Sequence, residues 1–409
     1  MQLAKDSKRA VRLAKRVLKG RRAYFDVREL LAQRGPLPAG TFRVGVYFAD
    51  SDVNLYQMRQ WYAPLRELSK THPVLLIARN AAGARALMQE SGLEVAFAQK
   101  VTALERLVEE QPLDVVLYVN QNTRNFQMMR YGRRWHVFVN HGESDKMYMT
   151  SNQHKAYDVA LVAGDAAQAR LSKALWDYDV ATRTIPIGRP QADHLAGDPP
   201  YPADGRTVVF YAPTWEGDRP AASYGSVATH GEALVQRLLE TGRHRVVYRP
   251  HPRSGVVNAE FGAANQRIIA ALAEANRRDP AAHHVYDDSP TLGWQLSLPD
   301  VAICDISAMI YDRLATGKPL MVTRPVDPEA EVDEGGYLSV CEWLDAGDTA
   351  RIDAVLDRVI GDDAARERLG TWSTHYFGDT SPGAPTRRFH AAIEQLLQRA
   401  DDWRARSAG

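Results

Sequence analysis

Short apolar runs alternate with segments of helical periodicity over most of the chain. Runs rich in β-branched and aromatic residues predict strands, and apolar residues spaced three and four apart predict helices. In the first half the predicted strands cover residues 42–48, 74–78, 114–119, 136–140, 159–163 and 184–187. The predicted helices between them cover residues 55–69, 81–90, 102–110 and 166–176. Because strands joined through helices pair in parallel, this half should form an α/β domain around a parallel sheet.

The alternation restarts after a stretch rich in proline, glycine and aspartate between Asp193 and Arg206. Such a stretch is typical of a domain boundary. The later predicted strands cover residues 208–211, 245–248, 301–304 and 320–323. The later predicted helices cover residues 232–241, 263–276, 307–316, 350–360 and, at the end, about 384–404. This half should therefore form a second α/β domain.

These patterns predict an α/β fold of two Rossmann-like, doubly wound domains that face a central cleft. A chain of 409 residues is too long for one ordinary core and fits two domains. We assign residues 1–38 to an arm and linker, 39–195 and 205–380 to the domains, and 381–409 to a helix packing back toward the first domain. Ligands of such sheets bind at the carboxyl ends of the strands, so the residues that follow each strand are site candidates. The sequence contains neither the glycine-rich dinucleotide fingerprint nor a P-loop.

The first 22 residues form a basic arm, with nine lysines and arginines against one acid. On a helical wheel of residues 3–19 the basic side chains fill one half and leucine, alanine and valine fill the other. Such an amphipathic helix suits an anionic membrane surface. The candidate membrane-binding residues are Lys8, Arg12, Lys15, Arg16 and Lys19. Packing on the protein itself and binding to nucleic acid are alternatives, and we expect the membrane as partner and no nucleic acid.

Composition narrows the class of protein. The chain is 45% hydrophobic and 25% charged, which excludes a wholly disordered, collagen-like or coiled-coil chain. No apolar window approaches about 18 residues and the N-terminus has no apolar signal core, so we expect a cytoplasmic protein, peripheral on the inner face of the cell membrane. Two cysteines, Cys304 and Cys341, cannot build a disulfide scaffold or a four-cysteine zinc site. We expect no resident metal and no permanently bound cofactor, and leave open a magnesium ion that arrives with a donor.

One candidate group follows a predicted strand of the first domain. Asn140-His141-Gly142 comes directly at the end of that strand, and the His-Gly corner presents an imidazole at the sheet edge. Histidine is the side chain best suited to proton transfer near neutral pH. Lys146, a few residues on, is a candidate partner for a phosphate. The alternative is a histidine with only a structural role in a turn.

Three further groups follow predicted strands of the second domain. Thr214, beside Trp215, offers a hydroxyl and backbone N–H groups to a phosphate or a base. Arg249 and His251 are held by flanking prolines, and a fixed cation beside a titratable donor suits a diphosphate. Ser307 begins a predicted helix, where it can cap the helix or help to bind an anion. Each group has a structural alternative: an aromatic turn, a rigid turn or a cap.

Taken in chain order, five motifs resemble the CDP-glycerol glycerophosphotransferase family of teichoic-acid primases and polymerases. They are His141-Gly142 with Lys146, Gly188-Arg189-Pro190-Gln191-Ala192-Asp193, Tyr211-Ala212-Pro213-Thr214-Trp215, Arg249-Pro250-His251-Pro252, and Asp305-Ile306-Ser307 with Asp312 and Gly317-Lys318-Pro319. The resemblance implies a GT-B architecture with the donor nucleotide on the second domain. It also implies attachment to the cytoplasmic face of the membrane, in keeping with the basic arm.

The resemblance also implies roles for individual residues. His141 corresponds to the catalytic base, and Arg249 and His251 to the motif that handles the donor pyrophosphate. Ser307 corresponds to a phosphate-binding helix start. We take His141 and His251 as catalytic candidates. The candidates for binding the donor or its phosphates are Arg249, Ser307, Thr214, Lys146 and Asp305.

The resulting hypothesis is a transferase that moves a glycerophosphate-like group from a CDP-linked donor such as CDP-glycerol. The acceptor would be a hydroxyl of a lipid-linked, cell-wall or capsule glycan. One alternative is a GT-B glycosyltransferase with a nucleotide-sugar donor for cell-surface polysaccharide. Another is a nucleotide-sugar epimerase that uses acids near Asp305 and Asp312. A third is a membrane-associated scaffold without catalysis, which has no need of strand-end histidines and arginines.

Overall fold

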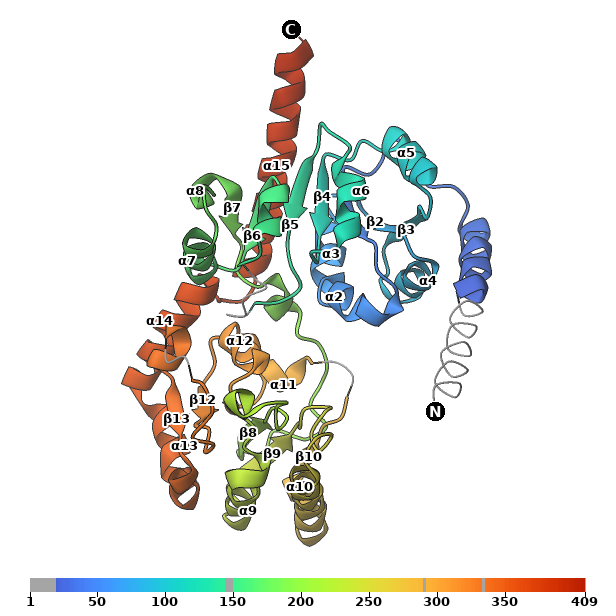
Figure 1. Cartoon of the computed structure of the whole chain (residues 1–409). Helices are drawn as coiled ribbons and strands as arrows, with labels where there is room; N and C mark the ends of the chain where they lie inside the picture. The colour runs from blue at the N-terminus through green and yellow to red at the C-terminus, as the bar shows by residue number, and fades with distance from the viewer. Residues whose placement is uncertain (1–19, 144–149, 290–291, 333–334, 409) are drawn as a thin grey trace, which may run out of the picture. The chain divides into compact units, whose positions relative to one another are not determined.

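The chain divides into two compact units. The computed structural model describes residues 20–143, 150–289, 292–332 and 335–408, and Figure 1 shows the whole chain from blue to red. The first unit runs to Val162 and adds Gln168–Ile187 and the residues from Thr386 onward, and the second comprises Ala163–Ala167 and Gly188–Pro385. The chain thus enters the second unit before the stretch in which we expected a boundary. Two contacts explain the difference: Arg189 pairs with Asp312 at 2.5 Å, and Asp193 accepts from the Gly383 N–H at 2.8 Å.

The described residues of the first unit form a seven-stranded parallel sheet in the order β3-β2-β1-β4-β5-β6-β7. The strands are β1 (Val44–Phe48), β2 (Val74–Ala78), β3 (Glu94–Phe97), β4 (Val115–Tyr118), β5 (Trp135–Phe138), β6 (Val159–Val162) and β7 (Thr184–Pro186). The direction of winding reverses between β1 and β4, which is the order of a doubly wound Rossmann sheet.

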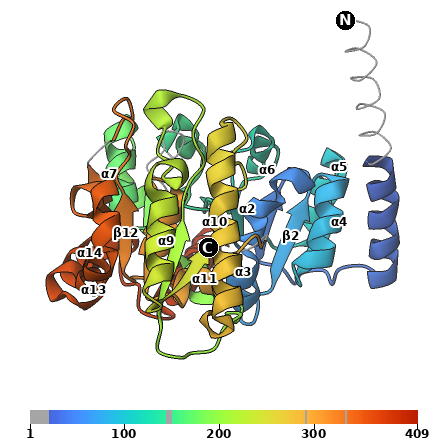
Figure 2. The same cartoon turned by 90° about the horizontal axis from the view of Figure 1, so that it is seen from below.

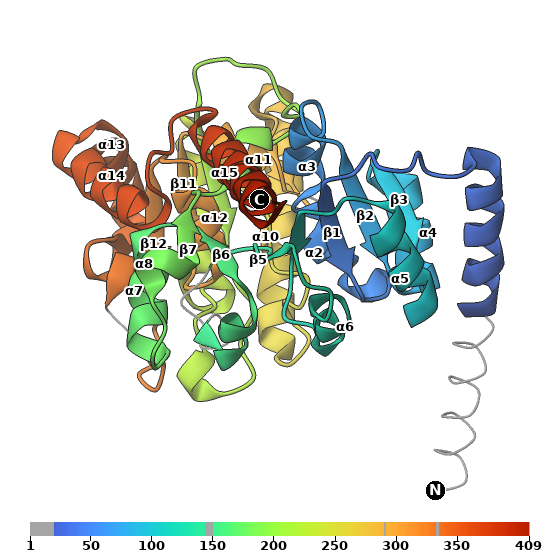
Figure 3. The same ribbon diagram turned by 90° about the horizontal axis from the view of Figure 1, so that it is seen from above.

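Helices connect these strands. They are α2 (Leu55–Arg59), α3 (Tyr62–Leu68), α4 (Ala81–Glu90), α5 (Val101–Glu110), α6 (Phe126–Met129), α7 (Asp165–Ala174) and α8 (Val180–Arg183), and an unlabelled helix covers residues 20–34. Figure 3 shows α4 and α5 beside β2 and β3. The single helix predicted over residues 55–69 is in fact two helices, α2 and α3. Pro64 has no N–H to continue the hydrogen bonds of α2, so a new helix starts at Tyr62.

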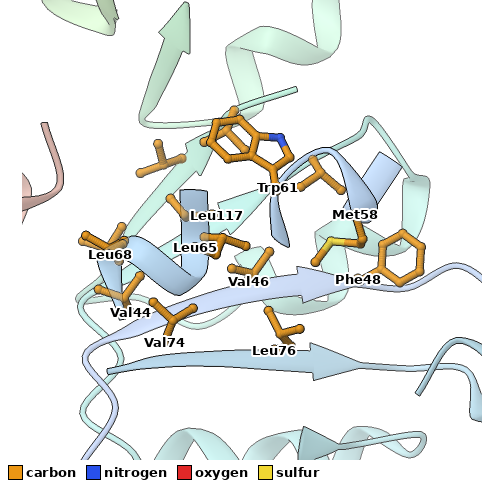
Figure 4. Packing of buried hydrophobic residues seen from close by; sticks show 14 of the residues in the cluster. Val44, Val46, Phe48, Met58, Trp61, Leu65, Leu68, Val74, Leu76 and Leu117 are labelled. Carbon is orange, nitrogen blue, oxygen red and sulfur yellow. The ribbon is translucent and has the colours of Figure 1, made fainter. Parts of the chain in front are cut away.

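The core of the first unit lies over β1. All five residues of β1 are buried, and Val46, Leu76 and Leu117 pack with side chains from α2 and α3 (Figure 4). Trp61, between these helices, is only 2% exposed, and its indole Nε1 donates to the main-chain oxygen of Asn140 at 2.5 Å. The core therefore reaches the turn that carries His141.

The last helix, α15 (Ala384–Ala408), belongs mostly to this same core. Phe389, Ile393 and Leu396 are fully buried in it, and the Phe389 ring lies 5.3 Å from that of Trp61. Near the end of the helix, Arg404 forms an ion pair with the buried Asp114. The C-terminal segment is thus structurally a part of the N-terminal unit.

The described residues of the second unit repeat the plan, with a six-stranded parallel sheet in the order β10-β9-β8-β11-β12-β13. The strands are β8 (Thr207–Ala212), β9 (His244–Tyr248), β10 (Val285–Tyr286), β11 (Val301–Cys304), β12 (Leu320–Thr323) and β13 (Glu342–Leu344). The helices are α9 (Glu232–Glu240), α10 (Ala259–Arg278), α11 (Trp294–Ser297), α12 (Ala308–Leu314), α13 (Ile352–Gly361) and α14 (Asp363–Phe377). Figure 2 shows α9 and α10 side by side. The predicted class of two doubly wound α/β units is confirmed.

The sequence pattern missed three strands, helix α14 and the helix of residues 20–34, which lies in the segment assigned to the arm and linker. The missed strands β3, β10 and β13 are two to four residues long and lie at sheet edges. An edge strand is half covered and needs no long apolar run, so its signal is weak. Helix α14 was missed because few of its residues are buried.

The described residues contain no helix that is long and apolar enough to cross a membrane. The predicted membrane-binding residues, Lys8 to Lys19, lie outside the described residues. In the helix of residues 20–34, Ala23 and Val27 are buried against the first unit, and Asp26 pairs with Arg85 at 2.9 Å. Phe25 points outward and is 63% exposed.

The burial of Phe389 predicts that α15 stabilises the first unit. Phe389→Ala should lower the free energy of unfolding by about 3–5 kcal/mol, because a fully buried ring leaves a cavity beside Trp61. Phe25→Ala, at the exposed phenylalanine, should change it by less than about 0.5 kcal/mol. Urea unfolding followed by tryptophan fluorescence measures both. Equal effects in the two variants would show that α15 is not part of this core.

Candidate functional site

His141 lies on a turn that is fixed from two sides. Asn140, which directly precedes it, has φ +54°, in the left-handed region that asparagine tolerates better than most residues. The Asn140 side chain donates to the Gly142 oxygen at 2.8 Å, and the Asn140 oxygen accepts from Trp61. The strand end, the core tryptophan and the glycine therefore set the direction of the imidazole.

The hydrogen bond of His141 to the main chain determines its tautomer. Nδ1 lies 3.0 Å from the Val119 oxygen, at the end of β4. A carbonyl oxygen only accepts, so Nδ1 carries the proton of the neutral ring and Nε2 holds the lone pair. The Tyr56 ring lies edge-on to the imidazole, 5.7 Å away and at 87°. His141 is thus arranged to accept a proton at Nε2.

A pocket of about 300 Å³ lies beside His141 within the first unit. It opens at the carboxyl ends of β1, β4 and β5, at the point where the strand order reverses. Its described lining is mostly carboxamide: Asp50, Asn54, Gln57, Asn120, Gln121, Asn122, Phe138, Asn140 and His141. Sequence reasoning missed Asp50, Gln57 and Asn120. Asp50 and Asn120 both follow strand ends, and this position in the sequence is the signal that could have identified them.

The loop after His141 is held by an ion pair that the sequence did not predict. Glu143, with a side chain 8% exposed, pairs with Arg170 on α7. This pair connects the His141 turn to α7, so its role is to position the loop. Lys146, the predicted phosphate partner, lies outside the described residues.

In the second unit, Asp305 is the centre of a buried network. Its Oδ2 accepts from the Thr214 N–H at 2.8 Å and the Ser226 N–H at 3.0 Å, and its Oδ1 accepts from the Thr323 hydroxyl. One carboxylate thus joins the end of β11 to the segments after β8 and to the end of β12. Burial raises the pKa of Asp305 to about 6, although the hydrogen bonds oppose the rise.

This network corrects the predicted role of Asp305. Its side chain is fully buried, so it has no surface with which to bind a phosphate, and a carboxylate repels an anion. Asp305 instead positions Thr214, the residue predicted to meet the donor. The two predicted residues are therefore brought together, one as the support of the other.

His251 follows β9 in a second ordered loop. Its Nδ1 accepts from the Arg253 N–H at 3.1 Å, so Nε2 carries the proton of the neutral ring. The His251 ring lies 6.5 Å from the ring of Trp215, at an angle of 29°. The Arg253 guanidinium lies over the same Trp215 ring, with its Cζ 3.8 Å from the ring centroid. His251, Trp215 and Arg253 form a mixed aromatic and cationic surface, which we call the Trp215 platform.

Glu216 ties this loop to the end of β8. Its carboxylate accepts from the N–H groups of Gly255, Val257 and Asn258 at 2.7–2.9 Å. These bonds outweigh burial and hold the pKa of Glu216 below its ordinary value. Glu216 is a functional support that the sequence did not indicate, because its partners are main-chain groups about 40 residues away.

Arg249 has a different environment from the one that we predicted. Its guanidinium pairs with Asp287 at 2.6 Å and donates to the Ser289 hydroxyl at 3.1 Å and the Ser289 oxygen at 2.9 Å. Burial raises the pKa of Asp287, but the hydrogen bonds from Ser289 and Arg249 and the charge of Arg249 outweigh it and hold this pKa below its ordinary value. Arg249 therefore pairs with a carboxylate that the sequence did not indicate and orders the segment after β10, and its role toward the donor stays a prediction.

Ser307 is a helix cap. Its hydroxyl accepts from the Met309 N–H at 3.3 Å at the start of α12, which confirms the cap, and the phosphate-binding role of Ser307 stays a prediction. Among the described residues, Ser307 and Arg249 are not joined to one another, and Thr214 and Asp305 are. Asp312, on α12, is occupied by Arg189.

No cluster of three or more histidine, cysteine or acidic residues suited to a metal ion occurs in the described part of the chain. No protein-family model matches the chain, and the sequence of no curated protein matches it either.

Solved structures do match. A Listeria monocytogenes protein assigned as a UDP-N-acetylglucosamine 2-epimerase is 14% identical, with a TM-score of 0.57 over 88% of this chain and 98% of its own. The wall teichoic acid polymerase TagF is 11% identical, with a TM-score of 0.54 over 98% of this chain and 99% of its own. A glycosyltransferase from Rickettsia africae is 10% identical, with a TM-score of 0.51 over 87% and 99%. At these identities the likeness shows the fold, which is the two-domain α/β fold of the GT-B type.

The Asp305 network predicts how stability depends on pH. Its pKa in the folded protein, about 6, lies above the ordinary value of 3.8, so the folded state binds this proton more tightly than the unfolded state. The contribution to stability is therefore full below about pH 4 and is lost as the pH rises through about 6, by about 3 kcal/mol. Asp305→Asn should remove this loss, because the amide oxygen can accept both N–H bonds and Thr323 can accept from the amide.

Asp305→Ala is the matched disruptive variant. It leaves the Thr214 and Ser226 N–H groups without their acceptor, at a cost of about 1–3 kcal/mol each. Urea unfolding of wild type and both variants at pH 4 and pH 7 measures the two effects. A wild-type pH slope equal to that of Asp305→Asn would contradict the assignment of this pKa.

Proposed function

We propose that the chain is a transferase that moves a glycerophosphate-like group from a CDP-linked donor to a hydroxyl of a lipid-linked or cell-surface glycan acceptor. The observation that carries the proposal is the pair of strand-end histidines with opposite tautomers. Val119 leaves His141 with a lone pair on Nε2, and Arg253 leaves His251 with a proton on Nε2. One histidine is arranged as a base and the other as a hydrogen-bond donor.

Phosphoryl transfer needs a base for the acceptor hydroxyl and a hydrogen-bond donor for the phosphate, and each unit carries one of these two groups. The acceptor hydroxyl would lose its proton to Nε2 of His141 while its oxygen bonds to the distal phosphorus of the donor. The bond from that phosphorus to the bridging oxygen would break, and CMP would leave with the bonding electrons. His251 would donate from Nε2 to a phosphate oxygen as negative charge develops there. Positioning and charge stabilisation supply most of the catalysis in this reaction class.

The Trp215 platform supports the proposal that a nucleotide binds to the second unit. An aromatic ring beside a cation offers stacking to a base and charge to a phosphate. Thr214 lies directly before Trp215 and is held by Asp305. Similarity of fold to the wall teichoic acid polymerase TagF agrees with this class of reaction.

Two other activities remain to be compared. A glycosyltransferase with a nucleotide-sugar donor would use the same base and the same platform. An epimerase would need acids near Asp305 and Asp312, but Asp305 is buried in main-chain hydrogen bonds and Asp312 is paired with Arg189. This occupation of both acids favours group transfer. Incubation with radiolabelled CDP-glycerol, CDP-ribitol and UDP-sugars, scored for transfer and hydrolysis, separates the donors.

Glutamine substitutions test the two histidines. His141→Gln and His141→Ala should both lower turnover by about 10²–10⁴, because neither side chain accepts a proton at neutral pH. His251→Asn should lower turnover about 10- to 150-fold, because it removes the Nε2 donor to an anion. His251→Gln places an amide N–H near the position of Nε2 and should recover part of the loss.

Single-turnover rates and nucleotide dissociation constants of these four variants decide the roles. Substitutions at His141 should leave donor affinity unchanged, since the base acts on the acceptor. Activity of His141→Gln close to wild type would remove His141 as the base. The same loss in both His251 variants would mean that a donor at Nε2 is not what His251 supplies.

We also propose that the basic arm holds the enzyme at the inner face of the cell membrane. Neutralisation of Lys8, Arg12, Lys15, Arg16 and Lys19 to glutamine in the full chain should weaken binding to phosphatidylserine-containing vesicles at least tenfold. Each base near an anionic surface contributes about 1 kcal/mol, and salt should weaken the attraction. Vesicles of phosphatidylcholine alone are the control. Equal sedimentation of both proteins with anionic vesicles would contradict a membrane role for the arm.

A further inference from the structure

We propose that the carboxamide pocket beside His141 recognises an uncharged polyhydroxyl group, the terminal alditol or sugar unit of an acceptor, and discriminates against a phosphate-terminated one. The proposal names the acceptor class and rests on the proposed function, in which His141 takes the proton of an acceptor hydroxyl. The carboxamide pocket is lined by Asp50, Asn54, Gln57, Asn120, Gln121, Asn122, Phe138, Asn140 and His141.

The chemistry of the lining matches hydroxyl groups. A carboxamide both donates and accepts hydrogen bonds, as does a hydroxyl, so a ring of carboxamides can satisfy adjacent hydroxyls of a polyol. A phosphate needs donors, and arginine or lysine supplies them best. The described lining of the pocket includes no arginine or lysine. It includes the carboxylate of Asp50, which would repel a second anion.

Hydrogen bonds fix the orientation of the Asn120 side chain within this lining. Its Nδ2 donates to Asp50 Oδ2 at 2.9 Å and to Gln57 Oε1 at 2.7 Å, and its Oδ1 accepts from the Asn122 N–H at 3.2 Å. The Asn120 main-chain oxygen accepts from Asn125 at 2.7 Å. With the Asn120 amide fully oriented, the acceptor atom of Gln57 is fixed, and the Gln57 amide N–H group is directed to Tyr56 at 3.3 Å.

Asp50 is held in place by close packing of α4. A Cβ atom added at Gly83 would lie 2.5 Å from the main-chain oxygen of Asp50, so only glycine allows this approach. The position of the Asp50 main chain after β1 is therefore fixed, and its carboxylate faces Asn120, which follows β4. The carboxamide pocket is a built arrangement of hydrogen bonds and packing, and its shape does not depend on flexible surface side chains.

The size and position of the pocket fit a terminal unit. A volume of about 300 Å³ lies at the small end of ligand pockets, which suits one glycan or alditol unit better than a chain. The pocket lies where the strand order reverses, the usual place for a ligand of such a sheet. His141 is part of the same lining, so a hydroxyl bound there is within the reach of a proton acceptor.

Binding of simple probes to the full chain tests this inference without any donor. The neutral probes are ribitol and methyl N-acetyl-β-glucosaminide, and the charged probe is sn-glycerol 3-phosphate. Saturation-transfer NMR titration should give binding of at least one neutral probe and at least tenfold weaker binding of the phosphate. Gln57→Leu should weaken the neutral probe about tenfold, the value of one lost hydrogen bond.

Two further variants keep the result interpretable. Gln33→Leu removes an exposed carboxamide on the helix of residues 20–34 and should bind as wild type does. Asp50→Asn keeps an acceptor for Asn120 but removes the charge, so it should bring the phosphate probe closer to the neutral one. If Gln57→Leu does not fold by circular dichroism, Asn122→Ala takes its place, with the same expected loss.

The proposal is overturned if the phosphate binds as tightly as the neutral probes, or if Gln57→Leu or its replacement leaves the neutral probe unchanged. It is also overturned if Asp50→Asn leaves the difference between the probes as it was. Failure of the proposed function gives a separate result. In that case the probes bind as expected, but no CDP- or UDP-linked donor is consumed by the wild-type protein.

Discussion

Parallel pairing around one central strand is the constraint on which the candidate site depends. In the first unit β1 pairs with both β2 and β4, and in the second unit β8 pairs with both β9 and β11. Parallel neighbours end at the same edge of a sheet, so segments far apart in sequence become neighbours there. Asp50 and Asn120 meet after β1 and β4, and Thr214 and Asp305 meet after β8 and β11.

Main-chain groups then decide the chemistry of the side chains at these edges. A carbonyl oxygen at Val119 and an N–H group at Arg253 give His141 and His251 opposite protonation at Nε2. Carboxylates act in the same way on whole segments: Asp305, which is buried, accepts from two N–H groups, and Glu216 accepts from three. Because the main chain of a packed sheet moves little, these side chains are held in one state before any ligand binds.

The arginines show how burial changes a role. Arg249 was predicted as a cation for the donor, but a largely buried guanidinium is stable only with a partner, and Asp287 supplies the charge. Arg189 pairs with Asp312 for the same reason, and this pair fastens the segment after β7 to α12. For Arg249 the sequence identified a residue near the end of β9 but not its partner Asp287.

The sequence by itself determined the alternation of strands and helices, the two-unit α/β class and the strand ends that carry the candidate residues. These follow from local periodicity, which a linear pattern contains: β2, β12 and α4 have the predicted bounds. Only the tertiary structure decided that Phe389 of α15 meets Trp61 in the first core, that Asp305 supports Thr214, and that carboxamides from separate strand ends surround His141. Each of these depends on contacts between segments tens to hundreds of residues apart. A sequence pattern does not contain such contacts, because the order of strands in the sheet, and not their order in the chain, sets which side chains meet.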